Sequence, residues 1–139
     1  MRASTAVAVT VLVLGGGSLA ACGGGDEQSP KPALCGSVND LGDAVGEISD
    51  IDFSSSGALK QLKKGMETVG QDLKDVQAQA KKEFSAQMDR TQQTYDDLSA
   101  SVIAAANHPS AASLKAVDSA LSAFNDETQT LVNDVQTTC

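Results

Sequence analysis

Apolar residues recur at helical spacing through most of the chain beyond residue 35. In the first segment they fall three or four residues apart and so share one stripe of a helix, formed by Val38, Leu41, Val45 and Ile48. Ser37, with Asp40 three residues later, is the start signal that we expect for this helix. The stretch DFSSSG, residues 52–57, is small and polar and predicts a connection.

The second segment keeps the same spacing for longer, through Leu59, Leu62, Met66, Val69, Leu73 and Val76. Consecutive four-residue steps through Ala80, Phe84 and Met88 then resemble a stutter in a coiled-coil seam. Because no Gly, Pro or Asn interrupts residues 73–106, we predict one continuous helix of about 48 residues, or roughly 70 Å. A break near Lys82, which gives a four-helix bundle instead, stays open as the alternative.

The last segment has the most regular pattern. Asn107 suits a helix C-terminal cap, and Pro109 suits the first position of a new helix. Heptad spacing then runs through Leu114, Val117, Leu121, Phe124, Thr128, Leu131 and Val135. No segment alternates with the period of a strand. We therefore predict an all-α fold, an elongated antiparallel helical bundle of three helices with a long central one, or alternatively a four-helix up-down-up-down bundle.

The first 21 residues have a different character. Arg2 supplies a positive charge, residues 6–14 are apolar, and GGGSLAA ends the region with small residues. This is the pattern of a secretory signal peptide, and the apolar run is too short for a transmembrane helix of roughly 20 residues.

Leu19 to Cys22, LAAC, resembles the lipobox of bacterial lipoproteins, and the alanine- and glycine-rich style is similar to actinobacterial sequences. The resemblance implies lipidation of Cys22 by a diacylglycerol, cleavage just before it, and an extracytoplasmic protein anchored to the cell membrane. Residues 22–34 would form a flexible tether and residues 35–139 a helical domain. Cleavage after Ala21 without lipidation, which releases a soluble protein with a free thiol, is the competing interpretation.

The other two cysteines, Cys35 and Cys139, bracket the helical domain. Three cysteines can form only one disulfide within the chain, so one cysteine stays unpaired, and lipidation would account for Cys22. Helices of about 24, 70 and 43 Å that alternate in direction bring both remaining cysteines to a similar height, and the four-helix alternative does the same. We therefore predict a Cys35–Cys139 disulfide, in a compartment where disulfides persist.

Charge excludes one class of partner. The chain has 18 acidic and 10 basic residues, a net charge of −8, and 3% aromatic residues. Loss of Arg2 with the signal peptide leaves nine basic residues and a net charge of −9. An acidic chain without a basic stripe lacks the electrostatic pattern of nucleic-acid binding, and anionic headgroups repel it. Membrane attachment is therefore expected from the lipid alone.

Candidate chemistry is sparse. His108 has no His or Cys beside it in sequence, and residues 50–61 begin like a calcium loop but carry Ser55 and Gln61 where the loop requires Gly and Glu. The clustered carboxylates of helix faces, such as Asp43 and Glu47, are expected to be solvated. We predict no catalytic residue, no metal and no cofactor, and therefore no enzyme.

The glycines Gly65 and Gly70 flank the second apolar stripe. Their small size suggests a close approach of the first helix, and local flexibility is the equally open alternative.

The long seam leads to a functional expectation. The seam carries more apolar surface than packing against one other helix of a short chain would bury. We therefore expect a non-catalytic, lipid-anchored helical protein that presents a coiled-coil-like surface to a protein partner or to itself. A small-ligand or lipid-binding carrier is the alternative.

Overall fold

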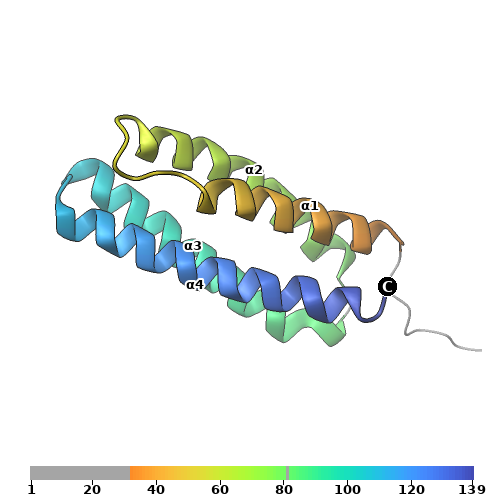
Figure 1. Ribbon diagram of the computed structural model, residues 1–139. Coiled ribbons are helices and arrows are strands. Elements are labelled where there is room, and N and C mark those ends of the chain that lie inside the picture. Colours follow the sequence, from red (N-terminus) through yellow and green to blue (C-terminus); the bar gives the residue numbers. More distant parts are fainter. Residues whose placement is uncertain (1–31, 81) are drawn as a thin grey trace, which may run out of the picture.

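The described part of the chain folds as four α-helices in up-down-up-down order (Figure 1). The computed structural model describes residues 32–80 and 82–139. The helices are α1 (Pro32–Ser49), α2 (Ala58–Gln79), α3 (Ser85–Asn107) and α4 (Ala111–Gln136), with a short 3-10 helix, η1 (Lys82–Phe84), before α3. No strand is present within these ranges. The predicted signal peptide, the predicted lipidation site at Cys22 and most of the predicted tether lie outside the described residues.

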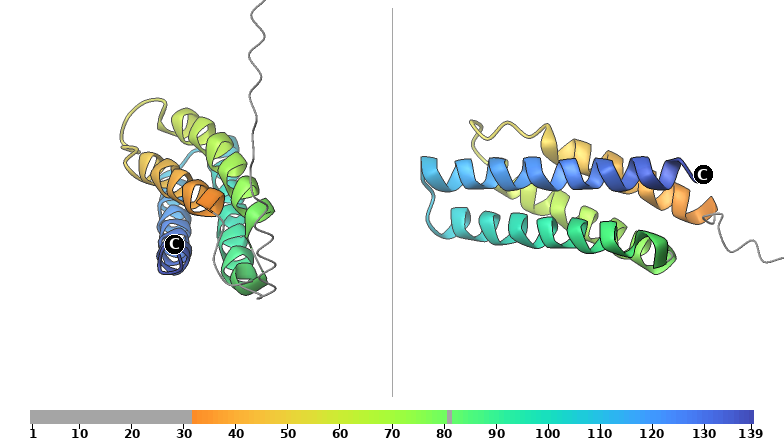
Figure 2. Two further views of the ribbon diagram at one scale, coloured as in Figure 1. Left: turned by 90° about the vertical axis from the view of Figure 1, so that its right-hand side faces the viewer. Right: turned by 90° about the horizontal axis from the view of Figure 1, so that it is seen from below.

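Each helix packs against its two neighbours around the bundle. Seen end-on, α1 lies between α2 and α4, and α3 completes the square (Figure 2). The pairs α3–α4 and α1–α2 pack most closely, and α2–α3 is the loosest of the four neighbouring pairs. We call the end with Cys35, the α2–α3 connection and Cys139 the disulfide end, and the end with residues 50–57 and 107–110 the loop end (Figure 1).

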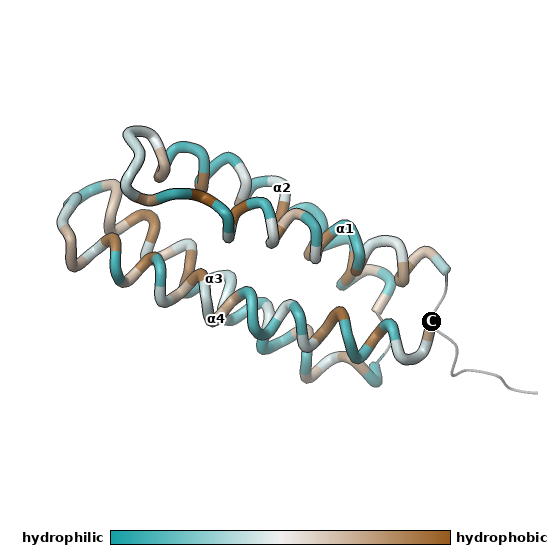
Figure 3. Tube along the Cα trace, viewed as in Figure 1, coloured by the Kyte–Doolittle hydropathy of each residue, from teal (hydrophilic) through white to brown (hydrophobic). Residues whose placement is uncertain are grey.

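All four apolar stripes face the inside of the bundle. Hydrophobic positions recur along each helix (Figure 3), and most members of the predicted stripes are buried, with Leu59, Ala80, Tyr95 and Leu114 half-buried. The exposed large hydrophobic residue among the described residues is Ile103, at 59%. The seam that suggested a partner is therefore largely covered by the chain itself. None of the described helices combines the length and the apolar composition that a membrane-crossing segment needs.

The prediction of one continuous 48-residue helix is wrong, and the break near Lys82 is correct. Helix α2 ends at Gln79, and the backbone of Ala80 is extended, with φ −63° and ψ 136°. Phe84 and Met88 beyond the break are both buried in the core. A straight helix would leave half of its stripe in water, whereas the fold buries both halves at about 1.5–3 kcal/mol per large side chain. Tertiary burial thus breaks a helix that contains no local breaker.

The two ends of the chain differ in detail from the prediction. Helix α1 begins at Pro32, three residues before the predicted domain start, and Leu34 is fully buried. Proline suits this first position because its missing N–H has no partner there. Ser37 is not the cap, since it lies inside α1 and its Oγ accepts a hydrogen bond from Gln79 Nε2 at 2.8 Å.

Helix α4 begins one residue after Ser110, so Pro109 precedes the cap instead of starting the helix. Ser110 Oγ accepts from the Ser113 N–H at 3.0 Å, and Ser113 Oγ accepts from the Ser110 N–H at 2.9 Å. This reciprocal pair is a capping box with serine in place of the usual glutamate.

Candidate functional site

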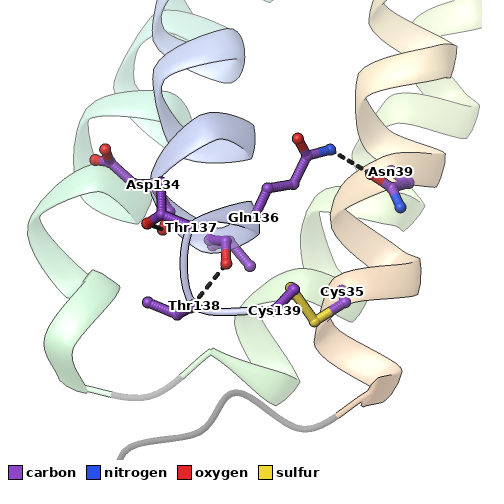
Figure 4. The surroundings of a disulfide bond; sticks show 8 residues. Cys35, Asn39, Asp134, Gln136, Thr137, Thr138 and Cys139 are labelled. Carbon is purple, nitrogen blue, oxygen red and sulfur yellow. Dashed lines mark hydrogen bonds between the residues drawn. A yellow bond between two sulfur atoms is a disulfide. The ribbon is translucent and has the colours of Figure 1, made fainter.

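The disulfide end ties the first helix to the last. Cys35 and Cys139 form a disulfide, the predicted pair, with their Cα atoms 6.2 Å apart and 104 positions apart in sequence (Figure 4). One turn further along, Gln136 Nε2 donates a hydrogen bond to Asn39 Oδ1 at 2.7 Å (Figure 4). These contacts fix the start of α1 against the end of α4.

A groove runs between α2 and α3, the loosest helix pair. At the loop end it opens into a pocket of about 360 Å³, which we call the distal pocket. Both helices contribute: the pocket is lined by Lys63, Met66 and Glu67 of α2 and by Tyr95, Ser99, Val102, Ile103, Ala106 and Asn107 of α3. Exposed Ile103 stands at its edge.

Tyr95 crosses the groove in its middle. Its hydroxyl donates a hydrogen bond to the Met66 backbone carbonyl at 2.9 Å, and its ring meets Phe124 of α4 edge-on, with centroids 5.7 Å apart. Burial raises the pKa of the Tyr95 phenol, and the nearby carboxylates of Asp96 and Glu67 raise it further. The neutral hydroxyl therefore holds α3 to α2 across the physiological pH range.

Gly70 makes room for this bridge. A β-carbon at position 70 would lie 2.6 Å from the Tyr95 hydroxyl oxygen. The sequence suggested that Gly65 and Gly70 both receive the first helix. The structure places only Gly65 against α1, where Ile48 covers it, while Gly70 faces α3.

Beyond Tyr95 the groove continues as a second, more polar hollow of about 480 Å³. Its lining includes Gly70, Gln71, Lys74, Gln77 and Gln92, and Gln77 Nε2 donates to Gln92 Oε1 at 3.0 Å across the gap. By comparison, α3 and α4 pack closely and carry the Arg90–Glu127 ion pair at 3.2 Å. Two polar bridges, one from Tyr95 and one from Gln77, therefore cross the groove between α2 and α3.

Charge around the groove is balanced, unlike the chain as a whole. The two hollows are lined by Lys63, Lys74 and Glu67, whereas the chain carries a net charge of −8. The outer face of α1 shows the contrast, because it exposes Asp40, Asp43 and Glu47 and α1 contains no basic residue. Partners that the rest of this surface would repel can approach the groove.

The other candidate residues do not come together. His108 is exposed just after α3 ends, and the carboxylates of Asp43 and Glu47 are solvent-exposed on α1. Asp52 Oδ1 accepts hydrogen bonds from the N–H and Oγ of Ser54, at 2.8 and 2.6 Å, which lowers the Asp52 pKa. In the described part of the chain, no three His, Cys, Asp or Glu side chains gather in a way that could hold a metal ion.

Sequence patterns missed the groove, although one signal was present. Residues 98–107 carry no charge, and Ile103 follows Val102 directly, so it falls outside the buried stripe. An isolated large apolar residue on an uncharged helix face marks this surface. Comparisons of the chain with protein-family models, with curated proteins and with solved structures gave no match.

Proposed function

We propose that this chain is a non-catalytic, lipid-anchored extracytoplasmic protein that binds a protein partner through the α2–α3 groove. The observation that carries the proposal is exposed Ile103 beside the distal pocket, on the least closely packed helix pair. The exposed Ile103 side chain and the apolar floor of the hollow together offer a partner apolar surface that would leave water on binding. The LAAC resemblance supports the anchor.

The direction of the bundle supports the same proposal. The sequence between Cys22 and Pro32 joins α1 at the disulfide end. The distal pocket is built from the first turns of α2 and the last turns of α3, at the loop end. Helix α4 alone spans about 39 Å between these ends. A lipid on Cys22 therefore holds one end of the bundle and leaves the groove accessible at the other.

The anchor is tested by the intact mass of the native protein extracted from its own membrane, with and without reductant. We expect the mass of residues 22–139 plus a diacylglycerol-type adduct, and a gain of two hydrogens on reduction of Cys35–Cys139. A mass without the adduct overturns the anchor.

The binding surface is tested by a photo-crosslinking amino acid placed at position 103 in cells. Position 123, an exposed alanine on α4, is the matched control. We expect a discrete protein adduct from position 103 and none from position 123. Equal yields from both positions, or none from either, contradict binding at the groove.

A carrier of a small apolar ligand is the second candidate, and the distal pocket is the observation that favours it. Met66 and Val102 give the hollow an apolar floor, and Lys63 offers a cation at its rim. Organic extraction of the purified protein, followed by mass spectrometry, tests this candidate. The absence of any co-purifying molecule contradicts it.

A further inference from the structure

The four helices form two hairpins that are joined to each other covalently at one end of the bundle. Helix α1 leads into α2 through residues 50–57, and α3 leads into α4 through residues 108–110, both at the loop end (Figure 1). The two hairpins are linked by the Cys35–Cys139 disulfide and by the chain between α2 and α3. Both links lie at the disulfide end, so within the described residues no covalent bond holds one hairpin to the other at the loop end.

The hydrogen bonds between the two hairpins follow the same direction. Among the described residues, side chains join the hairpins at three levels, which are, from the disulfide end, Gln136 to Asn39, Gln77 to Gln92, and Tyr95 to the Met66 carbonyl. Beyond Tyr95, residues 58–65 of α2 and 96–107 of α3 continue to the loop end. No hydrogen bond or ion pair connects the hairpins over this described stretch. Tyr95 therefore makes the outermost bond between them.

The packing between the hairpins is also looser than the packing within them. The pairs α1–α2 and α3–α4 pack more closely than α1–α4 and α2–α3 do. At the loop end both seams between the hairpins are hollowed. The distal pocket lies in the α2–α3 seam, and a hollow of about 200 Å³ lies in the α1–α4 seam, lined by Ser49, Asp118, Leu121, Ser122 and Asn125. The loop end is thus where the two hairpins are least firmly joined.

We propose that the two hairpins open at the loop end about a hinge at the disulfide end, and that the Tyr95 hydroxyl holds them closed. Each hairpin keeps its own packing and its helix hydrogen bonds in the open form. This form is a minor state, because opening exposes apolar core side chains to water. Met66 and Val102 line the distal pocket from opposite hairpins, so opening widens that pocket. The opening belongs to the bundle itself and does not depend on which partner the groove binds.

The test measures how fast a thiol reagent reaches the core at the two ends of the full chain. Val45→Cys and Val38→Cys place thiols on the same buried stripe of α1, about two turns apart, with Val45 nearer the loop end. Mass spectrometry of the separate peptides distinguishes each introduced thiol from Cys22. Under native conditions we expect Val45→Cys to react at least about tenfold faster than Val38→Cys. Equal rates overturn the proposal.

A second pair places the same probes on the other hairpin. Val117 and Val135 are both fully buried in α4, with Val117 near the loop end and Val135 near the disulfide end. We expect Val117→Cys to react faster than Val135→Cys by a similar factor. A gradient in α1 without one in α4 would mean that the end of α1 frays alone, and would overturn a hinge between hairpins.

Amide hydrogen exchange separates hinge opening from unfolding of the helices. Rigid opening leaves the helix hydrogen bonds intact, so the amides of residues 62–65 and 96–105 should stay protected while the loop-end thiols react. Amide exchange at the rate of thiol exposure would show that the helices unfold, and would overturn the hinge.

Two substitutions test the role of Tyr95. Tyr95→Phe removes a bond that breaks on opening, so the Val117→Cys rate should rise about two- to tenfold. Gly65→Ala strains a contact within the α1–α2 hairpin, which opening preserves. It should raise the Val135→Cys rate, which reports global unfolding, and leave the Val117→Cys rate unchanged. No rise with Tyr95→Phe, or an equal rise at both positions with Gly65→Ala, overturns the proposal.

Discussion

The backbone of Gly65 lies so close to Ile48 that a β-carbon at position 65 would overlap the Cγ2 methyl of that side chain. Ile48 is 2% exposed, and its branched Cβ restricts rotation away from the contact. The close packing of α1 on α2 at this level therefore depends on the missing side chain. It makes Gly65 a packing residue, although glycine is unfavourable inside a helix.

Gly65→Ala is expected to lower the free energy of unfolding by about 1–3 kcal/mol, because the new methyl overpacks the core. Gly46→Ala is the matched control, since Gly46 is exposed in α1 and a β-carbon there meets nothing within 4 Å. The control should gain about 0.5–1 kcal/mol from helix propensity. Urea unfolding measures both. A gain in both variants contradicts the packing role, and Ile48→Leu, which removes the methyl, should reduce the cost of Gly65→Ala.

Reduction of the Cys35–Cys139 disulfide is expected to lower the free energy of unfolding by about 4–5 kcal/mol. The bond closes a loop of 104 positions, so its loss frees a large denatured-state ensemble. Urea unfolding with and without reductant measures the change. A Cys22→Ser variant should show the same difference, because Cys22 takes no part in the bond. A difference below about 1 kcal/mol would contradict the predicted stabilisation.

Thr128→Val is expected to raise the free energy of unfolding by about 1 kcal/mol. Thr128 is 1% exposed, and its hydroxyl has no hydrogen-bond partner, so it loses water without compensation. Thr91 is the control, because it is equally buried but its Oγ1 donates to the Gln87 carbonyl at 2.9 Å. Thr91→Val should therefore give no gain. Thermal and urea unfolding of both variants check this, and equal gains would show that the unpaired hydroxyl is not the cause.

Asp72→Asn is expected to stabilise the protein at pH 7. Partial burial, then the carboxylates of Asp40 and Asp75, raise the pKa of Asp72 above its ordinary value of 3.8. Folding therefore disfavours the charged form, and this penalty is absent below pH 3.8, sets in as the pH rises above 3.8 and is complete above the folded pKa. Because the side chain is partly solvated, the gain should stay below about 1 kcal/mol.

Unfolding of Asp72→Asn at pH 7 and at pH 3 measures this dependence. Asp89→Asn, an exposed residue of α3, is the control for the loss of one negative charge. A gain of equal size at both pH values would contradict an electrostatic origin.

Tyr95→Phe is expected to cost about 0.5–1.5 kcal/mol, because the hydrogen bond to the Met66 carbonyl is lost. Gly70→Ala should also destabilise, since its β-carbon would lie 2.6 Å from the Tyr95 hydroxyl oxygen. The cost of Gly70→Ala should fall in the Tyr95→Phe background. A double-mutant cycle measures this coupling, and strictly additive costs would contradict the contact.

The fold was predictable from the spacing of apolar residues, whereas the chain reversal near Lys82 was predicted only as the alternative to one continuous helix. The stripes from Val38 to Ile48 and from Val117 to Val135 correctly predict the buried faces of α1 and α4. The break at Ala80 follows from burial of both halves of one stripe, which no local signal such as Gly or Pro announces. Helix starts were missed where serine acts in an unusual role, as in the Ser110 cap.

The groove was less accessible to sequence reasoning than the core. It depends on which two helices pack loosely, and this follows from the chain reversal that the pattern left open. Tyr95 was placed in a stripe like any core residue, whereas its hydroxyl bridges two helices. The lipid anchor stays a prediction from the LAAC resemblance.

The disulfide turns the folded part of the chain into a closed covalent ring from Cys35 to Cys139. The crosslink holds both ends of this ring. Fraying from the N-terminal or the C-terminal side therefore cannot pass Cys35 or Cys139 unless a helix between them unfolds. Machines that degrade proteins by threading them through a narrow pore would meet two strands side by side instead of one. Resistance to unfolding from either end is therefore built into the covalent topology, independently of how tightly the four helices pack.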